Sequence, residues 1–126
     1  MRTKTPKLLE DIRDAAAYIA EVARGRSLED YRRERMLRQA IERNFEIIGE
    51  AVGRLTGVDP DTAARVGSHR QIVDFRNVLI HGYDLIDDRI VWSTIAEKIP
   101  VLLAEVESLC GGPGNLDSRR RTKTDR

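Results

Sequence analysis

An arginine, an amide, an imidazole and a phenol occur within the eight residues Arg76–Tyr83. In a helix, Asn77 and His81 are four residues apart and share one face. Arg76 projects about 140° further round, at roughly 100° per residue, although its long side chain can swing back. A glycine then interrupts the helix, and Tyr83 follows it directly. Together these groups offer a general base, a phosphate-binding cation and a hydroxyl group.

Each of these side chains also has an ordinary structural role. Arg76 is equally suited to an ion pair with Asp74, Asp84 or a carboxylate on a neighbouring helix. His81 lies near a helix end, where an imidazole can interact with exposed carbonyl groups. Tyr83 follows a glycine, a common place for an aromatic residue at the edge of a core. The other histidine, His69, is expected to be solvated or to cap its helix.

The composition limits the class of protein. With 126 residues, the chain is long enough for one domain with a buried core. Charged residues interrupt every apolar stretch, so we expect neither a membrane span nor a signal peptide. Cys110 is the single cysteine, which excludes an intrachain disulfide and a cysteine metal cluster. The expected location is the reducing cytoplasm.

The net charge of +1 is unevenly distributed. Residues 113–126 hold five basic and two acidic residues, so residues 1–112 hold 17 basic and 19 acidic ones. Any contact with nucleic acid must therefore use a local patch rather than the overall field. The stretch 24–43 has seven arginines and four carboxylates. We expect a solvated face with internal ion pairs, although Arg32, Arg35 and Arg38 are placed to touch an RNA backbone.

Apolar residues recur every three or four positions along most of the chain, which predicts helices. The expected helices cover residues 5–24, 28–55, 60–66, 69–81 and 88–109. Their start signals are Thr5-Pro6, a capping box from Ser27 to Asp30, Asp59-Pro60, Ser68, and Asp87 or Asp88. Pro100 lies inside the last helix and is expected to kink it or to mark a tighter turn.

Two glycines inside the second predicted helix, Gly49 and Gly53, indicate close packing or a bend, because glycine costs about 1 kcal/mol there. No segment alternates with a period of two, so no sheet is expected. The prediction is an all-α, mostly antiparallel bundle of about four to five helices over residues 5–110. The basic tail, residues 111–126, is expected to be disordered.

The motif has the form arginine, four residues, histidine, any residue, tyrosine, and other short blocks accompany it in a fixed order. These blocks are Leu9-Glu10-Asp11-Ile12, Ile48-Gly49-Glu50-Ala51, Ile90-Val91-Trp92, and Ile99-Pro100 followed by Leu103. In this combination the chain resembles the HEPN superfamily, and within it the HepT-like toxins of toxin–antitoxin pairs. The resemblance covers roughly residues 8–109.

The resemblance implies an endoribonuclease toxin that cleaves RNA without a metal or another cofactor. His81 would act as the base and Arg76 would stabilise the phosphate oxygens, with Asn77 in support. The family places its motif in a cleft between two copies, which implies a homodimer. It also implies a partner, a minimal nucleotidyltransferase antitoxin that adds AMP to Tyr83 and so neutralises the toxin.

Two alternatives remain open on the sequence. The chain could be a non-catalytic helical partner that binds nucleotide or serves as a scaffold for the transferase. Such a partner would not need an intact Arg76–His81 pair. Asp84, Asp87 and Asp88 resemble a magnesium cluster, but capping of a helix N-terminus accounts for them more simply, so no metal site is expected.

Overall fold

The computed structural model describes residues 3–81 and 87–111 of the 126-residue chain. These residues form helices and connecting turns, and no strand occurs among them. The helices are α1 (Thr5–Ala23), α2 (Leu28–Arg33), α3 (Arg35–Val58), α4 (Pro60–Ala64), α5 (His69–His81) and α6 (Asp88–Leu109). The all-α prediction is confirmed. The predicted disorder of the tail concerns residues that lie almost entirely outside this description.

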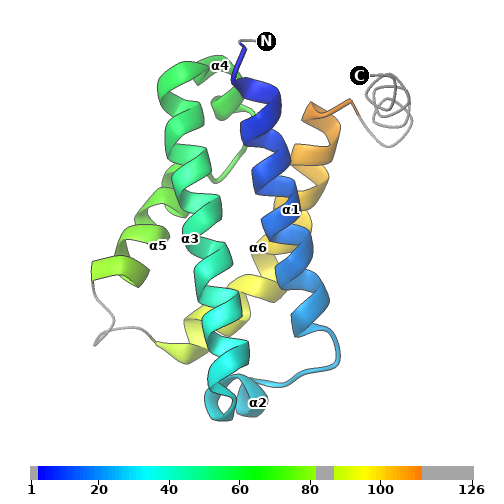
Figure 1. The fold of residues 1–126 in the computed structure, drawn as a ribbon, viewed down its shortest axis with the longest axis vertical. Helices are drawn as coiled ribbons and strands as arrows, with labels where there is room; N and C mark the ends of the chain where they lie inside the picture. The colour runs from blue at the N-terminus through cyan, green and yellow to red at the C-terminus, as the bar shows by residue number, and fades with distance from the viewer. Residues whose placement is uncertain (1–2, 82–86, 112–126) are drawn as a thin grey trace.

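The three long helices α1, α3 and α6 form the body of the bundle (Figure 1). α1 runs antiparallel to both α3 and α6, while α2 and α4 cover opposite ends (Figure 1). α5 lies on the outer side of α3 and runs antiparallel to it. None of the helices in the described ranges is both long enough and apolar enough to cross a membrane.

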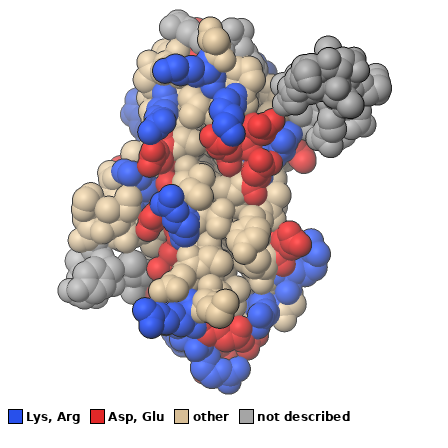
Figure 2. Space-filling model, viewed as in Figure 1, with Lys and Arg blue, Asp and Glu red and all other residues tan. Residues whose placement is uncertain are grey.

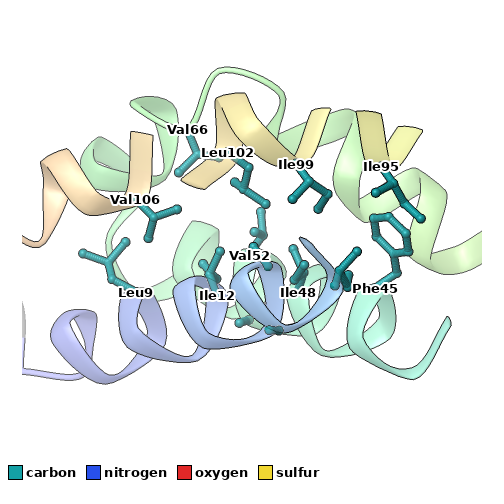
Figure 3. Close-up of a cluster of buried hydrophobic side chains, with 14 of the residues drawn as sticks. Leu9, Ile12, Phe45, Ile48, Val52, Val66, Ile95, Ile99, Leu102 and Val106 are labelled. Carbon is teal, nitrogen blue, oxygen red and sulfur yellow. The ribbon is translucent and has the colours of Figure 1, made fainter. Parts of the chain in front are cut away.

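The core fills the space between the three long helices (Figure 3). Each contributes one buried stripe, because apolar side chains three or four residues apart lie on the same helix face. Ile12, Val52 and Val106 are fully buried members from α1, α3 and α6. Val66, in the link after α4, closes the core beside Leu102 (Figure 3).

One predicted helix is wrong: residues 28–55 do not form a continuous helix, because the chain leaves helical geometry at Glu34. Glu34 is extended, with φ −101° and ψ 103°. Both of its carboxylate oxygens accept from Arg26 Nη1 at 2.8 Å. Arg38 donates to the backbone carbonyls of Tyr31 and Arg32, which the break leaves without helical partners.

The break lets α2 turn Tyr31 into the bundle. Its side chain is fully buried, with the ring 5.6 Å from that of Trp92 on α6. The hydroxyl donates to Glu42 at 3.0 Å. Burial and the nearby Glu42 carboxylate raise the pKa of this phenol far above its usual value. The predicted capping box is confirmed, since Ser27 and Asp30 exchange two hydrogen bonds at the start of α2.

The first helix also begins differently from the prediction. Lys4 occupies the cap position, and Thr5 lies inside the first turn with its side chain fully buried. The Thr5 hydroxyl donates to Asp59 at 2.7 Å. Asp59 caps α4 as predicted, accepting from the Thr62 backbone at 3.2 Å and the Thr62 hydroxyl at 2.8 Å. This buried carboxylate therefore ties the start of α1 to the α3–α4 junction.

Replacing Thr5 by valine, which has nearly the same shape, should lower the free energy of unfolding by about 1–3 kcal/mol, because the buried Asp59 carboxylate loses a donor. Urea unfolding would measure the loss. Thr56→Val is the matched control, since the Thr56 hydroxyl binds only the Val52 carbonyl on an exposed turn. Equal losses in the two variants would contradict the role given to the Thr5–Asp59 bond.

Candidate catalytic site

The motif lies at the end of α5, and α3 is the helix that fixes its position. The Phe75 ring meets that of Phe45 edge-on, with centroids 5.1 Å apart. Leu79, one turn later, is buried. With these residues facing the bundle, the helical repeat turns Arg76 towards α3 and leaves Asn77 and His81 exposed.

Arg76 is held at its base by a close approach between the two helices. A Cβ atom built on Gly49 of α3 would lie 2.2 Å from the Cβ of Arg76. The stem of Arg76 therefore occupies space that only glycine leaves open. The expectation of close packing is confirmed at Gly49. It does not hold to the same degree at Gly53, where the nearest atom, on Val73, lies at an ordinary 4.0 Å.

The guanidinium group of Arg76 lies beside two polar side chains. Its Nη2 is 3.8 Å from Oε1 of Glu50, and its Nη1 donates to Oδ1 of Asn77 at 3.4 Å. Glu50 makes a shorter ion pair, 2.9 Å, with Arg54. The expected alternative of a carboxylate on a neighbouring helix is thus confirmed, and Glu50 supplies it. Because the pair with Arg76 is long and partly exposed, it leaves the guanidinium able to bind another anion.

His81 is the last residue of α5 and its side chain is exposed. Among the described residues, no hydrogen bond joins His81 to Arg76 or Asn77. One chain therefore brings Arg76 and Asn77 together and presents His81 separately on the outer face. Tyr83 and Asp84 lie outside the described residues, so a position for Tyr83 beside Arg76 and His81 stays a prediction.

Other candidate residues have structural partners. His69 places Nδ1 3.0 Å from the Val66 carbonyl oxygen, which confirms the expected capping role. Asp87 caps α6 by accepting from the Arg89 backbone at 2.9 Å, and Asp88 lies 3.9 Å from Arg32. In residues 3–81 and 87–111, no three His, Cys, Asp or Glu side chains gather as a metal site would require.

The arginine-rich stretch forms the end of the molecule where α2 lies. Basic and acidic side chains alternate on this surface (Figure 2). Its ion pairs include Arg26–Glu34 at 2.8 Å and Arg33–Asp30 at 3.3 Å. The prediction of a solvated face with internal pairs is confirmed for these residues. Arg38, by contrast, is committed to backbone carbonyls and is not free for a ligand.

An apolar groove opens between α5 and α6 and has a volume of about 240 Å³. Its apolar lining comes from three helices and consists of Phe45, Ile48, Ile72, Phe75, Ile99 and Leu102. Two exposed apolar side chains flank it: Val78, one turn after Phe75, and Ile90, one turn before Thr94. The groove therefore continues as an apolar surface up to the motif.

Sequence reasoning missed two features of this region. Glu50 was quoted as part of a family-like block but given no role, although a carboxylate next to a helix-interior glycine was a usable signal. The groove between α5 and α6 could not be anticipated, because the same periodicity describes a helix face that is covered and one that is open.

Comparisons with known proteins agree with this geometry. The family model described as "Ribonuclease HepT-like" matches residues 12–109. A protein of Caldanaerobacter subterraneus subsp. tengcongensis, named as a candidate RNase, is 36% identical over 84% of this chain and 95% of its own length. A "Probable ribonuclease HepT" of Thermococcus cleftensis is 33% identical over 86% of this chain and 98% of its own length.

A third relative, a candidate RNase of Methanocaldococcus jannaschii, is 31% identical over 79% of this chain and 90% of its own length. No solved structure matches the chain significantly. The family model covers all the described helices from within α1 to the end of α6, including the Arg76–His81 motif. The chain belongs to the HepT-like ribonuclease family of the HEPN superfamily.

Proposed function

We propose that this protein is a metal-independent endoribonuclease, the cytoplasmic toxin of a toxin–antitoxin pair, with the helical domain of residues 5–110 as its catalytic unit. One observation carries the proposal. Arg76 is anchored by its stem against α3, while its guanidinium lies beside Asn77 with only a long contact to a carboxylate. That arrangement suits a cation that must receive a phosphate group.

The proposed reaction uses the 2′-hydroxyl of RNA as the nucleophile. His81 removes the 2′ proton, and the 2′ oxygen then forms a bond to the adjacent phosphorus. Negative charge grows on the non-bridging oxygens, and Arg76 stabilises it with paired N–H donors. The bond from phosphorus to the 5′ oxygen breaks and that oxygen takes up a proton, which gives a 2′,3′-cyclic phosphate and a 5′-hydroxyl.

The proposed independence from metal rests on what the two side chains provide. Imidazole supplies a base that is effective near neutral pH, and guanidinium supplies positive charge at the phosphate. These are the two services that a divalent ion would otherwise perform in such a cleavage.

Arg76→Ala should lower the rate of RNA cleavage about 10²- to 10³-fold, and His81→Ala about 10²- to 10⁴-fold, with folding preserved because both heads are partly or fully exposed. Cleavage of a fluorescent RNA and circular dichroism would test this. Arg70→Ala is the matched control, an exposed arginine earlier on α5. Full activity in either motif variant, or loss of activity with EDTA alone, would refute the mechanism.

We propose further that the active form is a homodimer. Each chain presents one motif histidine, so a second copy is needed if another imidazole is to protonate the leaving oxygen. The apolar surface from the α5–α6 groove through Val78 runs up to the motif. Covering it with a second copy would remove apolar area from water and bring two motifs to one cleft.

Light scattering at micromolar concentration should give twice the 14.3 kDa chain mass. Val78→Glu should yield a folded monomer with little cleavage activity, because a charge would be buried at the interface. Met36→Glu is the control, since Met36 is the most exposed large apolar residue but belongs to α3 near α2. A wild-type monomer that cleaves RNA would defeat the paired-site argument.

Control of the toxin is proposed to act through Tyr83. The partner is a minimal nucleotidyltransferase, which would transfer AMP to the phenolic oxygen and release pyrophosphate. The new phosphodiester would be attracted to Arg76 and would occupy the place of the substrate phosphate. Cleavage would stop because both access and positive charge are lost.

Co-expression with the cognate transferase should add one AMP mass to the chain, as seen by intact mass spectrometry. Tyr83→Phe should abolish the addition and leave cleavage intact. Tyr18→Phe is the matched control, because Tyr18 is an exposed phenol on α1. Modification that persists in Tyr83→Phe, or maps to a serine or threonine, would overturn this part of the proposal.

The second candidate function is a non-catalytic nucleotide-binding or scaffolding subunit of the transferase. The pairing of Arg76 with Glu50, and the lack of a bond between Arg76 and His81 within one chain, favour it. It predicts a stable complex with the transferase and no RNA cleavage by the purified chain, so the cleavage assay above separates the two functions.

A further inference from the structure

We propose that Gly49 is a positioning residue for Arg76: the missing side chain on α3 sets where the arginine stem lies and therefore where its guanidinium meets a phosphate. The inference rests on the proposed function. It assigns a role to a residue that touches neither the RNA nor the reacting atoms.

The steric observation is unusually specific. A Cβ on Gly49 would lie 2.2 Å from Cβ, 2.6 Å from Cγ and 3.0 Å from Cδ of Arg76. Rotating the arginine about χ1 moves Cγ and Cδ but leaves Cβ in place. A methyl group at position 49 can therefore be accommodated only if the backbone of α5 moves.

The required movement is large on the scale of catalysis. Ordinary contacts begin at 3.4 Å, so the atom pair now at 2.2 Å would have to separate by roughly 1.2 Å. The neighbouring contact between Phe45 and Phe75, with centroids 5.1 Å apart, would have to loosen with it. A misplacement of about 1 Å in a catalytic group can lower a rate on the order of 10²-fold.

The head and the stem of Arg76 both take their position from one turn of α3. Gly49 admits the stem, and Glu50, the next residue, lies 3.8 Å from Nη2. Nε is buried and has no hydrogen-bond partner in the described structure, so packing rather than bonding fixes this part of the side chain. Shifting α5 outward would separate the guanidinium from Glu50 and expose Nε to water.

Gly53 provides a matched control on the same helix. It lies one turn after Gly49 and also faces α5, but a Cβ there would meet only Val73, at 4.0 Å. Alanine stabilises a helix relative to glycine wherever there is room. Gly53→Ala should therefore raise the melting temperature by a few degrees, whereas Gly49→Ala should lower it by about 5 °C or more.

The melting experiment does not depend on ribonuclease activity. In an Arg76→Gly background all three close contacts disappear, so adding Gly49→Ala should no longer lower the melting temperature. If the loss persists in that background, or if Gly49→Ala melts like the wild type, the steric basis is wrong. This comparison also covers the case in which Gly49→Ala alone does not fold, because the double variant should then regain a cooperative transition.

The activity experiment asks whether Gly49 acts through Arg76. Gly49→Ala should lower kcat for RNA cleavage about 100-fold, while Gly53→Ala should leave it unchanged. The double variant Gly49→Ala, Arg76→Ala should cleave no more slowly than Arg76→Ala alone, because the positioned group is already gone. A further large loss in the double variant would refute a positioning role. Wild-type protein that does not cleave RNA would refute the proposed function instead, and the melting comparison would still decide whether Gly49 holds Arg76.

Discussion

The close approach of α5 to α3 is the constraint on which the site depends. α3 has apolar stripes on two sides: one packs against α1 and α6, and the other receives α5. Within α3, the residues that face α5 range from the large Phe45 to Gly49, which has no side chain. Bulk at one turn and its absence at the next set both the separation of the helices and the rotation of α5 about its axis. That rotation directs Arg76 inward and Asn77 and His81 outward.

The sequence was sufficient for the elements whose signals are local. The capping box at Ser27, the cap-then-proline start of α4 and the start of α6 at Asp87 all appear where short-range rules place them, because each is completed within three residues. The break at Glu34 was not predictable in this way. The residues around it form an acceptable helix, and the interruption is stabilised by contacts of Tyr31 with Glu42 and with Trp92 on α6.

The site was predictable to a similar extent. The shared face of Asn77 and His81 follows from helical spacing, and both side chains are indeed exposed. The possible return of the Arg76 side chain towards that face depended on its freedom to rotate. Its stem is instead confined by Gly49, 27 residues earlier in the chain, and its head lies beside Glu50. Spacing within one helix carries no information about a neighbour of that kind, whereas the unusual glycine in α3 was a visible, if unspecific, sign of it.

The stacking of Trp92 on Tyr31 gives the molecule a built-in optical signal. Trp92 is the only tryptophan in the chain, and it belongs to the first turns of α6, close to the end of the described gap after His81. Its indole emission therefore reports a single place, the junction where α2 meets α6. Because α2 is held there by tertiary contacts across the break at Glu34, loosening of this corner would change the emission before the long helices separate. The fluorescence of the unmodified protein thus distinguishes undocking of one end of the bundle from unfolding of the whole.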